Sequence, residues 1–289
     1  MGNEFVSCSF LFLLFVMLAP GVTSNVLRLP SMDFAEQIED DGHGHGHGHH
    51  SSHMHMGMGM GVSNLANYDP TFTVMKDVQV GKTMPISFPY IDDLRPYQFL
   101  PREKTRHIPF SSKALPELRR YFSVTPGSKT DIAMKQTLDF CEKEPPRGEA
   151  TACVTSFESL AEYARGIVGS DSEVGIVRSS LISSTTPTLQ NYTVVESKEI
   201  LTGKVIPCHA EPYVYAVYYC HFQVNTDNKL FMVSLRGENG DWVDAVFLCH
   251  MDSSPWSEES KSLLRLGLKP GESEVCHFFP AYDLVVVPQ

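Results

Sequence analysis

Four Cys-His dipeptides in the C-terminal part of the chain constrain its fold most. They stand at Cys208-His209, Cys220-His221, Cys249-His250 and Cys276-His277. The surrounding segments are rich in Val, Tyr and Phe and are separated by turn-forming residues, a pattern that predicts strands. Adjacent side chains of a strand point to opposite faces, so we expect the cysteines to face one way and the histidines the other.

The regular elements that the sequence predicts define a fold class. Beyond Gly169, strands are expected at 191–200, 214–224, 229–237, 242–251, 274–279 and 283–288, and a helix at 257–268. Earlier in the chain, helices are expected at 111–122, 131–141 and 155–168. We therefore predict an α+β fold, a mainly antiparallel β sandwich or partial barrel with a few flanking helices, disulfide-bonded and preceded by a flexible segment.

The helix expected at 155–168 carries start signals and an apolar face. Thr155 and Glu158 have the spacing of a capping box. The apolar face is expected to comprise Phe157, Leu160, Ala161, Ala164 and Ile167. Cys141 ends the preceding helix and Cys153 precedes this one, so a local disulfide across the loop 142–152 is predicted, worth about 3 kcal/mol on the chain-entropy model.

The N-terminus resembles a secretory signal peptide. Its apolar run at 10–19 is too short to span a bilayer, and Val22 and Ser24 suit the cleavage positions. The missing Lys or Arg leaves a buried N-terminal strand as the alternative. We divide the chain into a signal peptide at 1–24, a variable segment at 25–67 and a folded domain at 68–289. No later apolar run in the sequence reaches about 18 residues, which predicts a chain with no transmembrane anchor.

The start of the variable segment bears on location. The sequence NVLRLP at 25–30 resembles the Asn-Pro-Ile-Arg type of plant vacuolar sorting signal, with Val26 and Leu27 in place of Pro and Ile. An unstructured start of the mature chain is the alternative. We expect the secretory pathway, with either the apoplast and cell wall or the vacuole as destination, and wall or storage-vacuole components as partners.

The variable segment contains closely spaced histidines and methionines. The histidines are His43, His45, His47, His49, His50, His53 and His55. Neutral imidazoles on a flexible chain bind Cu(II), Zn(II) or Ni(II), and thioethers favour Cu(I), so weak metal binding is predicted here. A solubilising spacer is the alternative.

Secretion decides how the cysteines are interpreted. Cys8 leaves with the signal peptide, and six cysteines remain in an oxidising compartment, where disulfides are the default. The four cysteines of the dipeptides are expected to form two disulfides, with all three pairings open. Asn191 begins an Asn-Tyr-Thr sequon and is a predicted glycosylation site.

The four histidines of the dipeptides are then left together on another face. Sites made of imidazole alone suit Cu(II) or Zn(II), so metal ions are the predicted ligands, with a buried hydrogen-bonded network as the alternative. The formal net charge of -11 excludes a nucleic-acid partner bound through its phosphates, because such binding requires a basic face.

The spacing of the dipeptides is similar to that of a known family. Ten, twenty-seven and twenty-five residues separate successive pairs. This pattern, together with YAVYYCH, CHMDSSPW, VCHFFP and MKQTLDFCE, resembles the plant BURP domain of the unknown-seed-protein or dehydration-responsive type. The resemblance covers about residues 72–288. It implies a secretory-pathway protein linked to seeds, reproductive tissue, the cell wall or stress, with copper held by His209, His221, His250 and His277.

The resemblance also implies an alternative activity. Some BURP proteins are copper-dependent peptide cyclases that join a Tyr or Trp side chain of their own chain to an unactivated carbon. The candidate core peptide here is VSNLANYDP, which contains Tyr68 but lacks the leading Gln and the repeats of such cores. No catalytic residue can be named from the sequence, so a non-enzymatic, copper-binding role is the first expectation.

Overall fold

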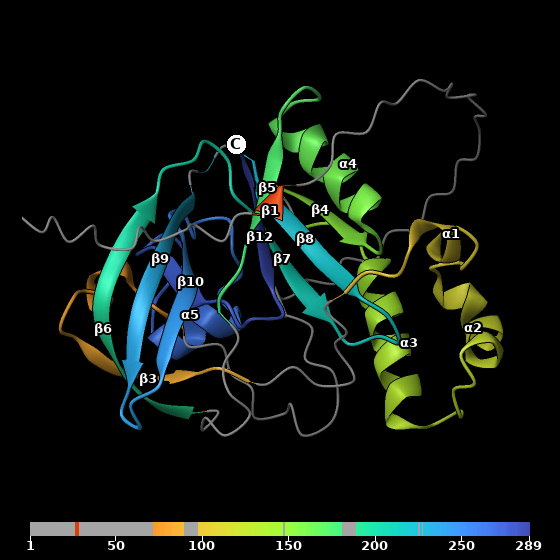
Figure 1. Ribbon diagram of the computed structural model, residues 1–289, viewed down its shortest axis with the longest axis horizontal. Coiled ribbons are helices and arrows are strands. Elements are labelled where there is room, and N and C mark those ends of the chain that lie inside the picture. The colour runs from red at the N-terminus through yellow and green to blue at the C-terminus, as the bar shows by residue number, and fades with distance from the viewer. Residues whose placement is uncertain are drawn as a thin grey trace, which may run out of the picture.

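The chain folds around two six-stranded antiparallel sheets, shown in Figure 1. The computed structural model describes residues 27–28, 72–89, 98–146, 148–180, 189–224, 226 and 228–289. The first sheet has the order β1 (Leu27–Arg28), β5 (Val174–Val177), β12 (Leu284–Pro288), β7 (Ile206–Glu211), β8 (Val217–Gln223) and β4 (Glu149–Val154). The second has the order β2 (Phe72–Thr73), β11 (Val275–Phe278), β10 (Trp242–His250), β9 (Asn228–Gly237), β6 (Leu189–Ile200) and β3 (Thr83–Ser87).

One apolar cluster joins the two sheets. Its buried members are Val177, Val285 and Val287 of the first sheet, Leu230, Val246 and Leu248 of the second, and also Val205 and Phe279. Ser179, just after β5, strengthens this contact, because its hydroxyl accepts from the amide of Val246 and donates to the carbonyl of Phe279. The contact between the sheets brings β7 and β8 of the first sheet close to β10 and β11 of the second.

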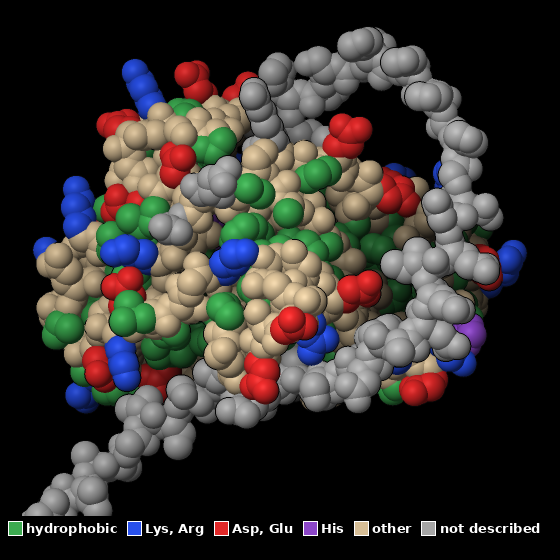
Figure 2. Space-filling model, turned by 90° about the horizontal axis from the view of Figure 1, so that it is seen from above, with side chains coloured by type: hydrophobic (Ala, Val, Ile, Leu, Met, Phe, Trp, Pro, Cys, Tyr) green, Lys and Arg blue, Asp and Glu red, His purple; other side chains and the backbone are tan. Residues whose placement is uncertain are grey.

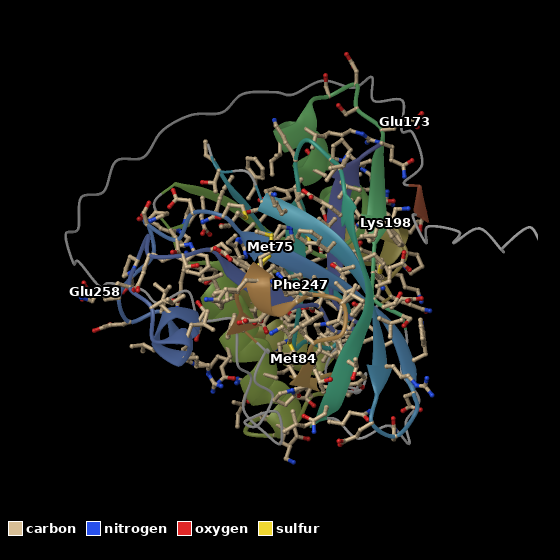
Figure 3. The ribbon with its side chains drawn as sticks, turned by 90° about the vertical axis from the view of Figure 1, so that its left-hand side faces the viewer. Met75, Met84, Glu173, Lys198, Phe247 and Glu258 are labelled. Carbon is tan, nitrogen blue, oxygen red and sulfur yellow. A yellow bond between two sulfur atoms is a disulfide. The ribbon has the colours of Figure 1, made fainter. Side chains whose placement is uncertain are left out.

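Each sheet also covers a core on its other face. The first sheet packs against α4 (Phe157–Val168), whose Leu160 and Ala164 are fully buried with Cys208 and Cys220. In the second sheet, Phe247 belongs to a buried cluster that includes Cys249 and Cys276. Met75 and Met84 pack against this cluster, and Figure 3 labels them together with Phe247. The disulfide sulfurs therefore lie in these outer cores.

Four further helices complete the fold. They are α1 (Arg102–Thr105), α2 (Leu115–Tyr121), α3 (Lys129–Cys141) and α5 (Lys261–Leu266), with 3-10 turns at Met75–Asp77 and Ser112–Ala114. In Figure 1, α1, α2 and α3 lie to the right of β8, α4 lies above β4, and α5 lies beside the second sheet. Arg119 of α2 and Asp131 of α3 form an ion pair that joins these two helices, with 2.6 Å between Nε and Oδ1.

The predicted fold class is confirmed, since the structure is mainly antiparallel β with a few helices and three disulfides. All six expected strands and all four expected helices are present, with shifted bounds. The sequence missed β4, which occupies part of the expected loop 142–152, and it also missed β2, β3, β5, β7 and the short helix α1. The expected flexible segment at 25–67 lies outside the described residues except for Leu27–Arg28.

The predicted start of α4 is wrong by one residue. Ser156, not Thr155, is the N-cap, and its hydroxyl accepts from the amide of Ser159 at 3.1 Å. The hydroxyl of Ser159 accepts in turn from the amide of Ser156, so two serines complete the capping box in place of Thr155 and Glu158. Phe157 is 46% exposed and is not a core residue of this helix.

The surface carries both signs of charge. Figure 2 shows Lys, Arg, Asp and Glu side chains interspersed, with hydrophobic side chains scattered between them. No helix within the described ranges is long and apolar enough to cross a membrane.

Candidate metal centre

Two disulfides fix the strands that carry the histidines. Cys208 and Cys220 lie directly opposite each other on β7 and β8, with their Cα atoms 4.0 Å apart, and are bonded. Cys249 and Cys276 have the same relationship on β10 and β11, also at 4.0 Å. The structure thus selects one pairing of the three that the sequence leaves open, and each bridge joins neighbouring strands of one sheet.

Each histidine follows its cysteine and therefore points to the opposite face of the strand. In the first sheet, His209 and His221 lie diagonally across the Cys208–Cys220 bridge. The predicted sorting of cysteines and histidines onto two faces agrees with the core clusters, because the cysteines lie in the outer cores and the imidazoles do not. The diagonal arrangement is repeated by the dipeptides of the second sheet.

The four imidazoles meet in a closed ring. Ring centroids are 5.6 Å apart for His209 and His221, and 5.7 Å apart for His221 and His250. They are 5.7 Å apart for His250 and His277, and 5.6 Å apart for His277 and His209. We call this group the histidine cluster; two of its members come from each sheet, and none is more than 9% exposed.

Aromatic side chains surround the histidine cluster. Phe279 stacks on His209 and His277, at centroid distances of 5.1 and 4.7 Å. Tyr219 stacks on His221 at 5.8 Å, and Trp256 meets His250 edge to face. These rings exclude water from the imidazoles, which favours their uncharged form.

Burial therefore shifts the acid–base properties of the cluster. Desolvation lowers the pKa of His221 to about 3, and the proximity of His209 adds to the effect. Desolvation and the neighbouring imidazoles also hold the pKa values of His250 and His277 well below their ordinary range. These three imidazoles are neutral at physiological pH, which is the state that binds a metal ion.

Polar side chains lie at the outer edge of the cluster. Nδ1 of His209 is 2.9 Å from Oδ2 of Asp283, and Nδ1 of His250 is 3.3 Å from Oε1 of Gln223. Nδ1 of His221 is 3.8 Å from Oε2 of Glu149, beyond hydrogen-bond range. Burial raises the pKa of Glu149 to about 7.

Several buried polar atoms of this region lack partners. Nδ1 of His221, Nε2 of His277 and Oε2 of Glu149 make no hydrogen bond with any described residue. Each such atom costs about 1–3 kcal/mol when it is desolvated without a partner. The alternative of a fully hydrogen-bonded histidine network therefore does not describe this cluster.

The donor chemistry of the cluster fits a metal ion, whereas its present geometry does not enclose one. Neutral imidazole nitrogens suit Cu(II) and Zn(II). Yet among the residues that the structure places, no group of three or more His, Cys, Asp or Glu side chains is arranged to hold a metal ion. Binding requires the rings to turn until their nitrogens lie about 2 Å from one point.

Other predicted site residues lie apart from the cluster. The predicted Cys141–Cys153 disulfide is present and joins the end of α3 to β4. Asn191 lies exposed on β6, and its amide donates to Glu238 at 3.1 Å, while its glycosylation stays a prediction. The histidines from His43 to His55 and Tyr68 lie outside the described residues.

No local sequence pattern predicted the residues that surround the imidazoles. Asp283, Gln223, Glu149 and Phe279 reach the cluster only because β12, β8, β4 and β11 are paired in this register. Asp283 stands 74 positions from His209, and no local pattern connects them. The only available signal was position, since Gln223 and Phe279 each stand two residues beyond a cluster histidine and so share its strand face.

The fold and this site define a class of protein: a disulfide-bonded β protein whose two antiparallel sheets meet at four buried histidines from Cys-His pairs. The chain belongs to the BURP-domain family, whose domain matches residues 71–288. The family resemblance predicted from the spacing of the dipeptides is thereby confirmed.

Curated relatives of the chain are plant proteins. It is 38% identical over 218 residues to BURP domain-containing protein 3 of Oryza sativa subsp. japonica, covering 74% of this chain and 49% of the relative. It is 34% identical over 228 residues to BURP domain-containing protein BNM2C of Brassica napus, covering 76% and 81%. It is 33% identical over 223 residues to BURP domain protein USPL1 of Arabidopsis thaliana, covering 75% and 79%. The match thus spans about half the length of the rice relative.

Proposed function

We propose that this chain is a secretory-pathway BURP-domain protein that binds copper through the histidine cluster. Its role would be non-enzymatic, in seed or reproductive development, the cell wall or the stress response, and its location the apoplast or the vacuole. The observation that carries the proposal is the meeting of four buried imidazoles from two sheets, with Nε2 of His277 lacking a partner among the described residues.

A metal-free arrangement of this kind is energetically costly. Buried polar nitrogens without partners destabilise a fold, and Nε2 of His277 has no partner among the described residues. An ion bound between the sheets would give this nitrogen a partner. Copper is favoured over zinc by the family resemblance, and the donor set itself suits both ions.

The experiment uses the mature chain, purified without metal and titrated with Cu(II). Deletion of residues 42–61 removes the weak sites expected in the variable segment. We expect one tight site to remain in the deletion variant and to disappear when His221→Ala and His250→Ala are combined. Isothermal titration calorimetry and the nitrogen hyperfine pattern in electron paramagnetic resonance report the site.

His107 supplies a matched control. It lies exposed between α1 and α2, bonded to the side chain of Arg106, far in sequence from the dipeptides. His107→Ala should bind copper as the parent does. Circular dichroism verifies that each variant is folded. Equal loss of tight binding from the deletion and from the cluster variant would contradict the proposal.

A second function, oxidative cyclisation of a peptide in the same chain, has one observation in its favour. Tyr219 and Trp256, whose rings can be oxidised, contact two imidazoles of the cluster. Against it stands the burial of all four histidines, because a core peptide would have to reach the ion. With Cu(II) and oxygen as oxidant, cyclisation should remove two hydrogens from one peptide, for example the peptide that contains Tyr68. Mass spectrometry of the proteolytic peptides tests this function, and unchanged masses in all of them would contradict it.

A further inference from the structure

A common pattern links three of the cluster histidines to polar side chains that are not part of any Cys-His pair. In each case the nitrogen involved is Nδ1, and the partner atom is a side-chain oxygen. The three partners come from three different segments, Asp283 before β12, Gln223 at the end of β8 and Glu149 at the start of β4. All three partners are buried or nearly so.

Asp283 makes the strongest of these contacts. One carboxylate oxygen lies 2.9 Å from Nδ1 of His209, and the other accepts from the backbone amide of Ala210 at 2.8 Å. The two contacts fix the carboxylate against two consecutive residues of β7. A carboxylate oxygen is an acceptor, so the imidazole proton of His209 stays on Nδ1, and Nε2 keeps its lone pair.

Gln223 has the same effect on His250. Its amide nitrogen points to the carbonyl of Asp252 at 3.5 Å, which turns the amide oxygen toward Nδ1 of His250. An amide oxygen accepts hydrogen bonds, so the proton of His250 is also held on Nδ1. The contact joins β8 of the first sheet to the end of β10 in the second.

Glu149 lies directly opposite Gln223 in the pairing of β4 with β8. Its Oε2 and the Nδ1 of His221 are both buried without a partner in the described part of the chain, and they are 3.8 Å apart. A modest turn of the His221 ring brings these two atoms within hydrogen-bond range.

We propose that Asp283, Gln223 and Glu149 are positioning residues that engage Nδ1 of His209, His250 and His221 and so leave Nε2 of each ring as the metal-binding atom. This inference rests on the proposed copper site. In His277, which belongs to the same ring of imidazoles, Nε2 is the buried nitrogen without a partner among the described residues, consistent with Nε2 as the common inward donor. Outer partners of this kind orient a ligand imidazole and fix its tautomer.

The first test needs no metal. Protein labelled with 15N at histidine, freed of copper by a chelator, gives a long-range 1H–15N spectrum that distinguishes the two imidazole tautomers. We expect His209 and His250 to carry the proton on Nδ1. In Asp283→Asn, one acceptor replaces two, because the amide nitrogen faces either the ring or the amide of Ala210, and the His209 signals should change while those of His250 stay.

The second test measures copper affinity in paired variants. Asp283→Asn and Gln223→Leu each remove an acceptor from the cluster. Asp131→Asn and Gln190→Leu alter a buried Asp and a buried Gln that bond elsewhere, to Arg119 and Tyr192. We expect the first two variants to weaken Cu(II) binding about 10- to 100-fold and the two controls to leave it unchanged.

The two tests separate this inference from the proposed function. Nδ1 protonation in the metal-free protein supports the positioning roles of Asp283 and Gln223 even if no copper binds to the cluster. Absence of copper binding would remove the proposed function and, with it, the assignment of Nε2 as the metal-binding atom. Protons on Nε2 of His209 and His250 would overturn the inference even if copper binds tightly. Copper affinities of Asp283→Asn and Gln223→Leu equal to those of the controls would overturn it too.

Discussion

Trp256 and His250 meet edge to face, with their ring centroids 5.3 Å apart and their planes at 67°. Trp242, the second of the two tryptophans in the chain, is 55% exposed at the start of β10, while His250 is at its end. Trp256 therefore lies against the histidine cluster, whereas Trp242 lies at the opposite end of β10 from His250.

This difference predicts an optical signal for copper. In Trp242→Phe, Trp256 is the only indole, and Cu(II) at the cluster should quench most of its fluorescence, because quenching by a paramagnetic ion requires proximity. In Trp256→Phe, the remaining Trp242 emission should change little at one equivalent of Cu(II). Similar quenching of both variants would place the ion elsewhere.

The disulfides provide a second prediction. Replacing Cys249 and Cys276 with Ala should lower the free energy of unfolding by about 3 kcal/mol and should also weaken copper binding, because this bridge fixes the strands of His250 and His277. The matched control replaces Cys141 and Cys153, whose bridge has no cluster histidine beside it. It should cost similar stability and weaken copper affinity less, because β4 carries Glu149 but no cluster histidine, as measured by denaturation and by titration. Equal loss of copper affinity in both would show that stability alone controls the site.

The pKa shifts predict how the stability of the metal-free protein depends on pH. His221, His250 and His277 have folded pKa values below 6.5, so the unfolded chain takes up protons first as pH falls, and stability decreases from about pH 6.5 downward. Glu149 acts in the opposite direction, because burial raises its folded pKa from the ordinary value of 4.5 to about 7, so stability is lost as pH rises between these two values.

Three imidazoles outweigh one carboxyl group in this balance. Urea denaturation with a chelator present should show stability increasing from pH 4.5 to pH 6.5, and the increase should be larger in Glu149→Gln. A flat or falling profile over this interval would mean that the imidazoles are not desolvated as the structure shows.

The start of α4 gives a prediction that separates the structure from the sequence pattern. Ser156→Ala removes the acceptor of the Ser159 amide and should cost about 1 kcal/mol. For a domain of this size that is a fall of about 2–4 °C in Tm. Thr155→Ala should cost less than about 0.5 kcal/mol. The measurement is differential scanning calorimetry. A larger loss of stability in Thr155→Ala than in Ser156→Ala would mean that Thr155 is the N-cap, as the sequence predicted.

Long strands with alternating or branched apolar residues could be predicted from the sequence because their pattern is local. The strand β10, for example, was expected at 242–251 and spans Trp242–His250. The strand β7 could not be predicted as readily, since Pro207 lies inside it and Pro212 follows it, and proline is uncommon in central strands. The strand β4 contains Glu and Ala, which have low strand propensity, and it forms because it pairs with β8.

The candidate site also contains residues that the sequence predicts and residues that it does not. The four histidines could be predicted because each stands beside a cysteine, and alternation along a strand separates the two residue types. Asp283 and Glu149 could not, because their place beside His209 and His221 depends on strand order and register. The pairing of Leu284 with Cys208 brings Asp283 to His209, and that pairing is a property of the assembled sheet.

The two halves of the histidine cluster belong to different sheets, and none of the disulfides in the described part of the chain connects those sheets. An ion in the cluster would link the two sheets, whereas the disulfides of the Cys-His pairs each join strands within one sheet. A ligand present at a thousand times its Kd stabilises the folded state by about 4 kcal/mol. The persistence of this protein in its compartment would then depend on the supply of metal there, and its abundance would rise and fall with the copper that is available to it.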